Sequence, residues 1–292
     1  MSALYDLLAA PFADFAFMRR ALVACAALSI GCGPVGVLLV LRRMSLVGDS
    51  MSHAVLPGAA VGFLVSGLSL VSMSIGGFVA GLLVALLSGV VSRTTQLRED
   101  ASFASFYLIS IALGVLIVST RGSNVDLMHV LFGTILAVDD RSLILVSAIA
   151  TASITTLALI YRPLVVECVD PGFLRSVGGR GGLYHLLFLV LVVLNLVAGF
   201  QALGTLMAVG LMMLPAAAAR FWAADLGALA AVSALIALHS GYVGLLLSFH
   251  FDLPSGPAIV LTAGAVYVVS LVAGPLGSLR RTLRLQPHHS PH

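Results

Sequence analysis

Lysine is absent from this sequence of 292 residues, in which all fifteen basic residues are arginine. The chain therefore has no P-loop lysine for nucleotide phosphates, and no lysine that could form a Schiff base or act as a general base. If ATP drives this protein, the nucleotide must bind to another polypeptide. Charged residues of either sign are also scarce, at 9% of the chain, which is too few to cover a soluble globule of this length.

Apolar sequence is abundant instead, because 60% of the residues are hydrophobic and the mean hydropathy is +1.12. Lipid must be the solvent. Every backbone polar group within a bilayer needs an internal partner, and the alternating pattern of membrane strands is missing. We therefore predict an all-α, polytopic transmembrane helix bundle that forms one domain over residues 1–292. The net charge of +3 is modest and the arginines are spread over short loops, so no nucleic-acid partner is expected.

Long apolar runs predict about nine membrane spans, with eight to ten as the possible range. A further apolar stretch at 125–138 is too short to cross a bilayer and reads as a partial or interfacial helix on the outer side. The nine runs lie at 21–41, 51–67, 70–91, 101–120, 142–161, 183–200, 203–219, 226–249 and 256–276.

The arginines of the short loops predict the orientation, because cytoplasmic loops are enriched in basic residues. With the C-terminus inside, nine crossings place eleven of the fifteen arginines on the cytoplasmic side and the N-terminus outside. Residues 1–20 then form an N-terminal surface segment and residues 277–292 a cytoplasmic tail. The longest polar loop, 162–182, is also cytoplasmic, and it reads equally well as a short helix along the membrane face or as an ordinary connector.

Asp49 and His53 are the first residues that need a chemical explanation, because ionisable side chains at the start of an apolar run are costly in a membrane. They are four residues apart and so share one face of a helix. A carboxylate and an imidazole on one face form half of a site for zinc, manganese or ferrous iron. In the alternative interpretation, Asp49 caps the helix N-terminus and His53 bonds a nearby backbone carbonyl.

Other polar residues are weaker candidates. Asp126 and His129 could meet an arriving ligand at the outer face, and His239 and His250 could line its route, although solvated loops explain all four residues more simply. The histidines of the C-terminal tail are assigned no site, since terminal tails are usually disordered. The three cysteines show no CxxC spacing, and we expect them to be buried apolar fillers: Cys25, Cys32 and Cys168.

Four segments together resemble the membrane subunits of bacterial ABC-type importers of zinc, manganese and iron, the ABC-3 family. The likeness extends from about residue 20 to residue 275, with the four segments in the family's order. They are GDSMSHAVLPG at 48–58, VDLMHVLFG at 125–133, GTLMAVGLMMLPAAAAR at 204–220 and DLPSGP at 252–257.

The resemblance implies a homodimer in the bacterial inner membrane, with an ATPase subunit on the cytoplasmic face and a metal-binding protein on the outer side. It also implies that Asp49 and His53 contact the transported ion. The loop 162–182 corresponds in placement to the segment that docks on the ATPase. Within that loop, Asp170, Phe173 and Gly178 are the candidate coupling residues.

We therefore expect a permease subunit that moves a divalent transition metal inward by alternating access, with ATP hydrolysed on the partner subunit. The chain itself is expected to perform no covalent catalysis and to hold no permanent cofactor. Histidine favours zinc slightly as the cargo, while manganese and iron remain the alternatives. A proton-coupled secondary transporter is the competing class, although no internal inverted repeat supports it.

Overall fold

The computed structural model describes residues 2–67, 69–121 and 138–276, and every regular element within these ranges is a helix. The stretch 125–138 and the C-terminal tail therefore lie almost wholly outside the described residues. The helices are α1 (Ser2–Leu8), α2 (Ala10–Asp14), α3 (Ala16–Leu41), α4 (Ser45–Ser66), α5 (Leu70–Thr94), α6 (Glu99–Arg121), α8 (Asp140–Val169), α9 (Pro171–Ser176), α10 (Gly181–Leu203), α11 (Thr205–Ala219), α12 (Leu226–Phe251) and α13 (Ser255–Ala273).

Each of the nine predicted spans corresponds to one helix of at least fifteen residues. Among the described residues, seven helices are long and apolar enough to cross a membrane, and α11 contains a shorter apolar stretch at Met207–Ala219. The remaining one is α4, which carries Asp49 and His53. The all-α bundle and its approximate number of spans are thus confirmed.

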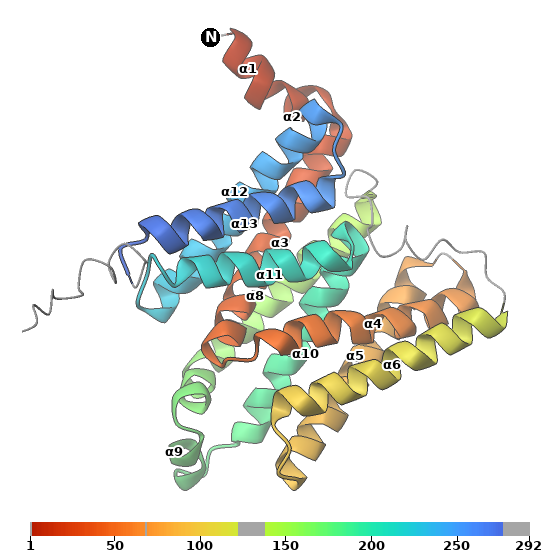
Figure 1. The fold of residues 1–292 in the computed structure, drawn as a ribbon, viewed down its shortest axis with the longest axis vertical. Coiled ribbons are helices and arrows are strands. Elements are labelled where there is room, and N and C mark those ends of the chain that lie inside the picture. The colour runs from red at the N-terminus through yellow and green to blue at the C-terminus, as the bar shows by residue number, and fades with distance from the viewer. Residues whose placement is uncertain (1, 68, 122–137, 277–292) are drawn as a thin grey trace, which may run out of the picture.

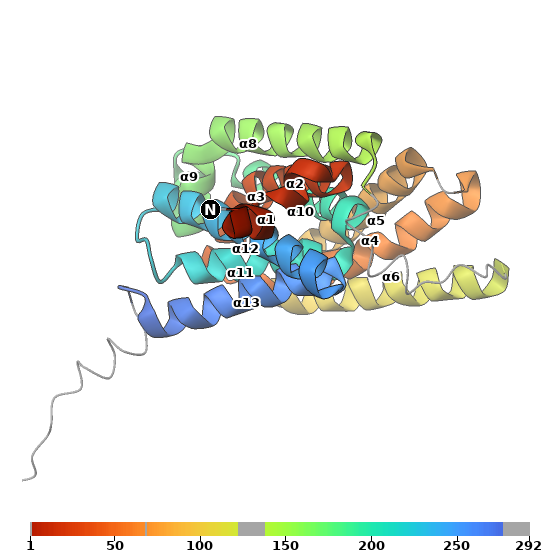
Figure 2. The same cartoon turned by 90° about the horizontal axis from the view of Figure 1, so that it is seen from above.

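The bundle is layered around α3 and α10. Figure 2 shows α8 along one edge of the molecule and α6 and α13 along the opposite edge, with α3 and α10 between them. The inner faces of α3 and α10 are almost wholly buried, and their side chains belong to one continuous hydrophobic core. This core fixes the frame on which the outer helices α4, α5 and α6 are held.

A buried amide joins three of these helices. Asn195 of α10 donates to Ser153 Oγ of α8 at 2.7 Å and to the backbone carbonyl of Leu191 at 2.8 Å. Its carbonyl oxygen lies against Gly31 of α3, where a Cβ would come within 2.6 Å of that oxygen. Interhelical hydrogen bonds of this kind replace the hydrophobic driving force that lipid does not supply.

The N-terminal helices α1 and α2 pack on the end of α12, as Figure 1 shows. Tyr242 donates its hydroxyl to the Leu8 carbonyl at 3.0 Å, and its ring stacks on Phe12. His250 Nε2 bonds the Leu7 carbonyl at 2.9 Å, so this histidine has a structural role in holding the N-terminus. The first span already begins at Ala16, which leaves a surface segment shorter than residues 1–20.

Glycines bring α4 and α5 into direct backbone contact. A Cβ at Gly58 would overlap the carbonyl oxygen of Gly76, and one at Gly76 would overlap the carbonyl of Gly58. Small residues allow such close approach of membrane helices. By contrast, Gly89 of α5 faces open space, since no neighbouring helix of the described chain comes within 4 Å of the place that a Cβ would take.

These two environments predict opposite outcomes for the same substitution. Gly58→Ala forces α5 away from α4 and should destabilise the protein by about 1–3 kcal/mol, as overpacking does. Gly89→Ala should be neutral or stabilise by up to about 1 kcal/mol, because alanine is the better helix former. Thermal unfolding of the purified protein in detergent measures both; equal midpoints for the two variants would contradict the packing described here.

Candidate functional site

The helix that carries Asp49 and His53 begins immediately after a tight turn. Arg43 adopts a left-handed conformation with φ of 58°, and Met44 donates its backbone N–H to the Leu39 carbonyl at 2.9 Å. Helix α4 then starts at Ser45, and its N-cap is Met44, which makes no side-chain capping bond. Asp49 thus lies inside the helix, and the alternative interpretation of this residue as the N-cap is wrong.

Asp49 and His53 lie side by side on one face of α4, as their spacing predicts. Asp49 Oδ1 is 3.8 Å from His53 Nε2, and their side chains are 60% and 40% exposed, respectively. The His53 ring stacks on Tyr107 of α6, with 6.0 Å between ring centroids and an interplanar angle of 29°. Two donors at this separation can contact one ion, because metal–nitrogen and metal–oxygen bonds are about 2.0–2.2 Å long.

Other contacts of α4 are made by close packing. Gly48 lies against Met213 of α11, and Pro57 lies against Gly114 of α6. Ser110 of α6 donates its hydroxyl to the Ala54 carbonyl at 3.4 Å. These contacts orient α4 so that the carboxylate and the imidazole face outward from the subunit.

One subunit does not complete a metal site in the part of the chain that the structure describes. Within that part, no three His, Cys, Asp or Glu side chains gather closely enough to hold a metal ion. His239 is exposed on α12, and His250 bonds Leu7 as described above. Asp126 and His129, together with the tail histidines, fall outside the described residues.

The candidate coupling residues surround the short helix α9, which Figure 1 shows at one extreme of the molecule. Asp170 caps this helix, since Phe173 donates its backbone N–H to Asp170 Oδ1 at 2.9 Å. Phe173 itself is 55% exposed, and Gly178 takes a φ of 76°, a conformation that suits glycine. Helix α8 extends to Val169, so the segment between the flanking helices is shorter than 162–182.

Sequence reasoning missed a polar chain near α9. Arg42 Nη1 contacts His185 Nδ1 at 2.6 Å, and His185 Nε2 contacts Glu99 Oε1 at 2.9 Å. Arg42 Nε also donates to Cys168 Sγ at 2.9 Å. His185 is an ionisable residue within an apolar helix, and that property alone could have singled it out.

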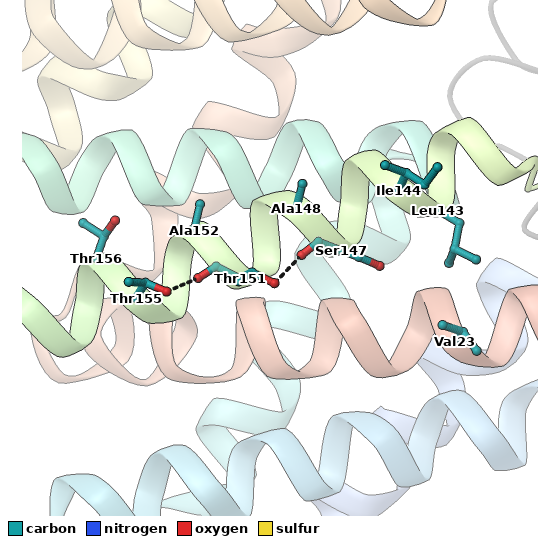
Figure 3. Close-up of a pocket in the computed structure, with 9 residues that line it drawn as sticks. All are labelled: Val23, Leu143, Ile144, Ser147, Ala148, Thr151, Ala152, Thr155 and Thr156. Atoms are coloured by element: carbon teal, nitrogen blue, oxygen red, sulfur yellow. Dashed lines mark hydrogen bonds between the residues drawn. The ribbon is translucent and has the colours of Figure 1, made fainter.

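A hollow along α8 does not have the chemistry of a metal site. Figure 3 shows its lining, which includes three hydroxyls in a row on one side of the helix, and its volume is about 860 Å³. Thr151 donates to the Ser147 carbonyl at 2.8 Å and Thr155 donates to the Thr151 carbonyl at 2.7 Å. Hydroxyls that bond the preceding turn of their own helix are satisfied there, and no carboxylate or imidazole lines the hollow among the described residues.

Several curated proteins are similar to this chain over most of their length. The manganese import system permease protein ScaB of Streptococcus parasanguinis is 33% identical over 262 residues, covering 90% of this chain and 92% of ScaB. The manganese transport system membrane protein MntC of Halalkalibacterium halodurans is 32% identical, covering 90% and 89%. The chelated iron transport system membrane protein YfeD of Yersinia pestis is 31% identical, covering 93% and 90%.

A solved structure has the same fold. The chain superimposes on PsaBC from Streptococcus pneumoniae, solved in complex with Fab, with a TM-score of 0.83 and 30% sequence identity, covering 98% of this chain and 99% of that one. Residues 14–274 match the ABC 3 transport family. This match does not support the alternative of a proton-coupled secondary transporter. The chain belongs to the ABC 3 transport family, as an integral membrane permease subunit of the bacterial inner membrane and not an enzyme.

Proposed function

We propose that this chain is the permease of a manganese importer and that Asp49 and His53 contact the ion during its passage. The observation that carries the proposal is the carboxylate–imidazole pair on one exposed face of α4. Two such groups displayed outward from an apolar span favour a functional role, because each is costly in contact with lipid.

The choice of metal rests on the relatives and not on the donor atoms. A carboxylate oxygen and an imidazole nitrogen suit manganese, ferrous iron and zinc alike. The sequence slightly favoured zinc, but the relatives described above carry names that specify manganese or iron. Manganese is therefore the first cargo to test, with iron and zinc as its competitors.

The exposure of Asp49 and His53 favours a permease made of two copies of this chain. A charged side chain within a membrane helix is costly, by about 2.5–3.5 kcal/mol at the helix centre on insertion scales, so Asp49 and His53 should face protein or water instead of lipid. A twofold axis beside this face of α4 would bring two carboxylate–imidazole pairs together and complete the coordination of one ion. Rocking of the two subunits then exposes this shared site alternately to either side.

Removal of either donor should abolish metal uptake. We expect Asp49→Ala and His53→Ala to lower ATP-dependent uptake of radioactive manganese into proteoliposomes at least about tenfold, since the metal loses a ligand. His239→Ala is the matched control, because it removes another exposed histidine of a membrane span. Zinc and iron uptake by the wild type in the same vesicles decides the cargo. Normal uptake by both α4 variants would refute the proposed site.

Sharing of one site by two subunits has a distinct signature. When wild-type chains are mixed with chains carrying both Asp49→Ala and His53→Ala, we expect uptake to fall as the square of the wild-type fraction, because each mixed dimer has an incomplete site. Two independent sites would instead give a linear fall. Uptake measured across a series of mixing ratios separates the two relations.

The same proposal assigns the segment around α9 to the contact with the ATPase subunit. In the predicted orientation the segment is cytoplasmic, with residues 277–292 as a tail on that side and the N-terminal surface segment outside. Phe173 protrudes from α9, while Asp170 and Gly178 shape the two ends of the helix. An exposed aromatic side chain on a short rigid helix is suited to anchor in a pocket of a partner.

Phe173→Ala should therefore weaken binding of the ATPase without unfolding the permease. We expect about 2 kcal/mol of lost affinity, typical of a buried aromatic anchor. Phe251→Ala is the matched control, because Phe251 is 68% exposed and ends helix α12. Co-purification of the ATPase with each variant is the measurement; equal recovery with both variants would show that Phe173 is no anchor.

A further inference from the structure

Four residues from four helices meet near α9 in a polar cluster that the proposed function does not use. Arg42 follows the end of α3, Glu99 opens α6, Cys168 is near the end of α8 and His185 lies in the second turn of α10. His185 is buried, and the Arg42 guanidinium also lies over the ring of Phe188, 4.9 Å from its centroid.

The partners of His185 define its protonation. Arginine can only donate, so His185 Nδ1 accepts from Arg42; a carboxylate accepts, so Nε2–H donates to Glu99. A neutral imidazole thus links a cation to an anion in one continuous chain. Breaking such a partly buried chain by removing one member is costly, because the other charges lose their partner.

Two residues of this hydrogen-bonded cluster lie just before, or at the start of, the helices that form the proposed metal site. Arg42 is separated from the start of α4 by the turn at Arg43, and Asp49 is in the second turn of that helix. Glu99 is the first residue of α6, and Tyr107, which stacks on His53, is eight residues further along. That separation is about 12 Å along a rigid helix, at 1.5 Å per residue.

The other two members flank α9. Cys168 is two residues before Asp170, the cap of α9, and His185 is four residues after Gly181, where α10 begins. The cluster is not saturated: Arg42 Nη2 is buried without a hydrogen-bond partner among the described residues. A network with open positions can rearrange its partners more readily than one in which every group is satisfied.

We propose that Arg42, His185 and Glu99 are positioning residues that transmit movement of α9 to the two helices forming the metal site. This inference rests on the proposed function, since it takes α9 as the contact with the ATPase. A displacement of α9 shifts the adjoining ends of α8 and α10. Because His185 of α10 bonds both Arg42 and Glu99, this shift also moves Arg42 and Glu99. Helices α4 and α6 then move with these two residues. Metal passage is thereby coupled to the ATPase cycle.

The test compares transport with ATP use in the complete importer, reconstituted with its ATPase and metal-binding subunits. Glu99→Gln removes the charge and keeps the shape, and His185→Phe keeps a ring without the bonds. We expect the amount of manganese moved per ATP hydrolysed to fall about tenfold in both variants, while hydrolysis stays within about twofold. Glutamine removes the anion and phenylalanine removes both ring nitrogens, so neither variant links Arg42 to a carboxylate, and both changes lie away from the nucleotide site. Asp100→Asn, at the neighbouring position of α6, should leave the ratio unchanged.

Other outcomes overturn the inference. An unchanged ratio in assembled complexes shows that the chain does not couple, and a proportional fall of uptake, hydrolysis and thermal stability shows that it is only structural. Failure of the proposed function is tested separately. Phe173→Ala tests ATPase docking and Asp49→Ala tests the metal site, and both variants keep the hydrogen bonds among Arg42, His185 and Glu99.

Exchange of the two charges between positions 42 and 99 gives a further test. Imidazole has two neutral tautomers, so Arg42→Glu combined with Glu99→Arg can rebuild the chain in the reverse direction. Recovery of the manganese-to-ATP ratio in the double variant, relative to Glu99→Gln, supports the inference even if His185→Phe prevents assembly. A double variant that assembles but remains uncoupled, or that fails to assemble, overturns it.

Discussion

The exclusion of water from the bilayer is the constraint on which this structure depends, because every polar group within it must find a partner in the protein. Several polar side chains of the bundle meet that requirement. Asn195 bonds Ser153 and the Leu191 carbonyl, and the hydroxyls of α8 bond the preceding turn of their own helix. Against this background, the outward-facing pair of Asp49 and His53 stands out, and ionisable residues of a membrane span are the ones for which a function is proposed first.

Much of this arrangement could be predicted from the sequence. Hydropathy locates all nine long helices, since each must cover a bilayer with apolar residues, and the spacing of Asp49 and His53 places them on one face. Contacts between distant residues could not be predicted, because no local pattern records that Arg42, Glu99 and His185 meet across three helices. Nor does a carboxylate with an imidazole distinguish manganese from zinc. The continuation of α8 to Val169 was missed because the apolar run ends at residue 161, where the polar loop 162–182 begins.

The packing of α4 explains how so sparse a site can be placed accurately. Gly58 meets the backbone of Gly76 in α5, and Pro57 meets Gly114 in α6, so the three helices are in contact without flexible side chains between them. Backbone contacts of this kind transmit displacement better than long side chains, which can change rotamer instead. Helices α4, α5 and α6 therefore hold the proposed ligands as one unit, with Tyr107 stacked on His53.

A weak site is what transport requires of this unit. An ion held by a full set of protein ligands within one subunit would leave slowly, whereas the two donors that we propose for each subunit would lose the ion as soon as the subunits separate or rotate. Movement of α4 relative to its copy would then change affinity without any change in the ligands themselves. Control of that movement therefore matters more to metal release than further ligands would. Such control can act at Arg42, in the turn before α4, and at Glu99, the first residue of α6.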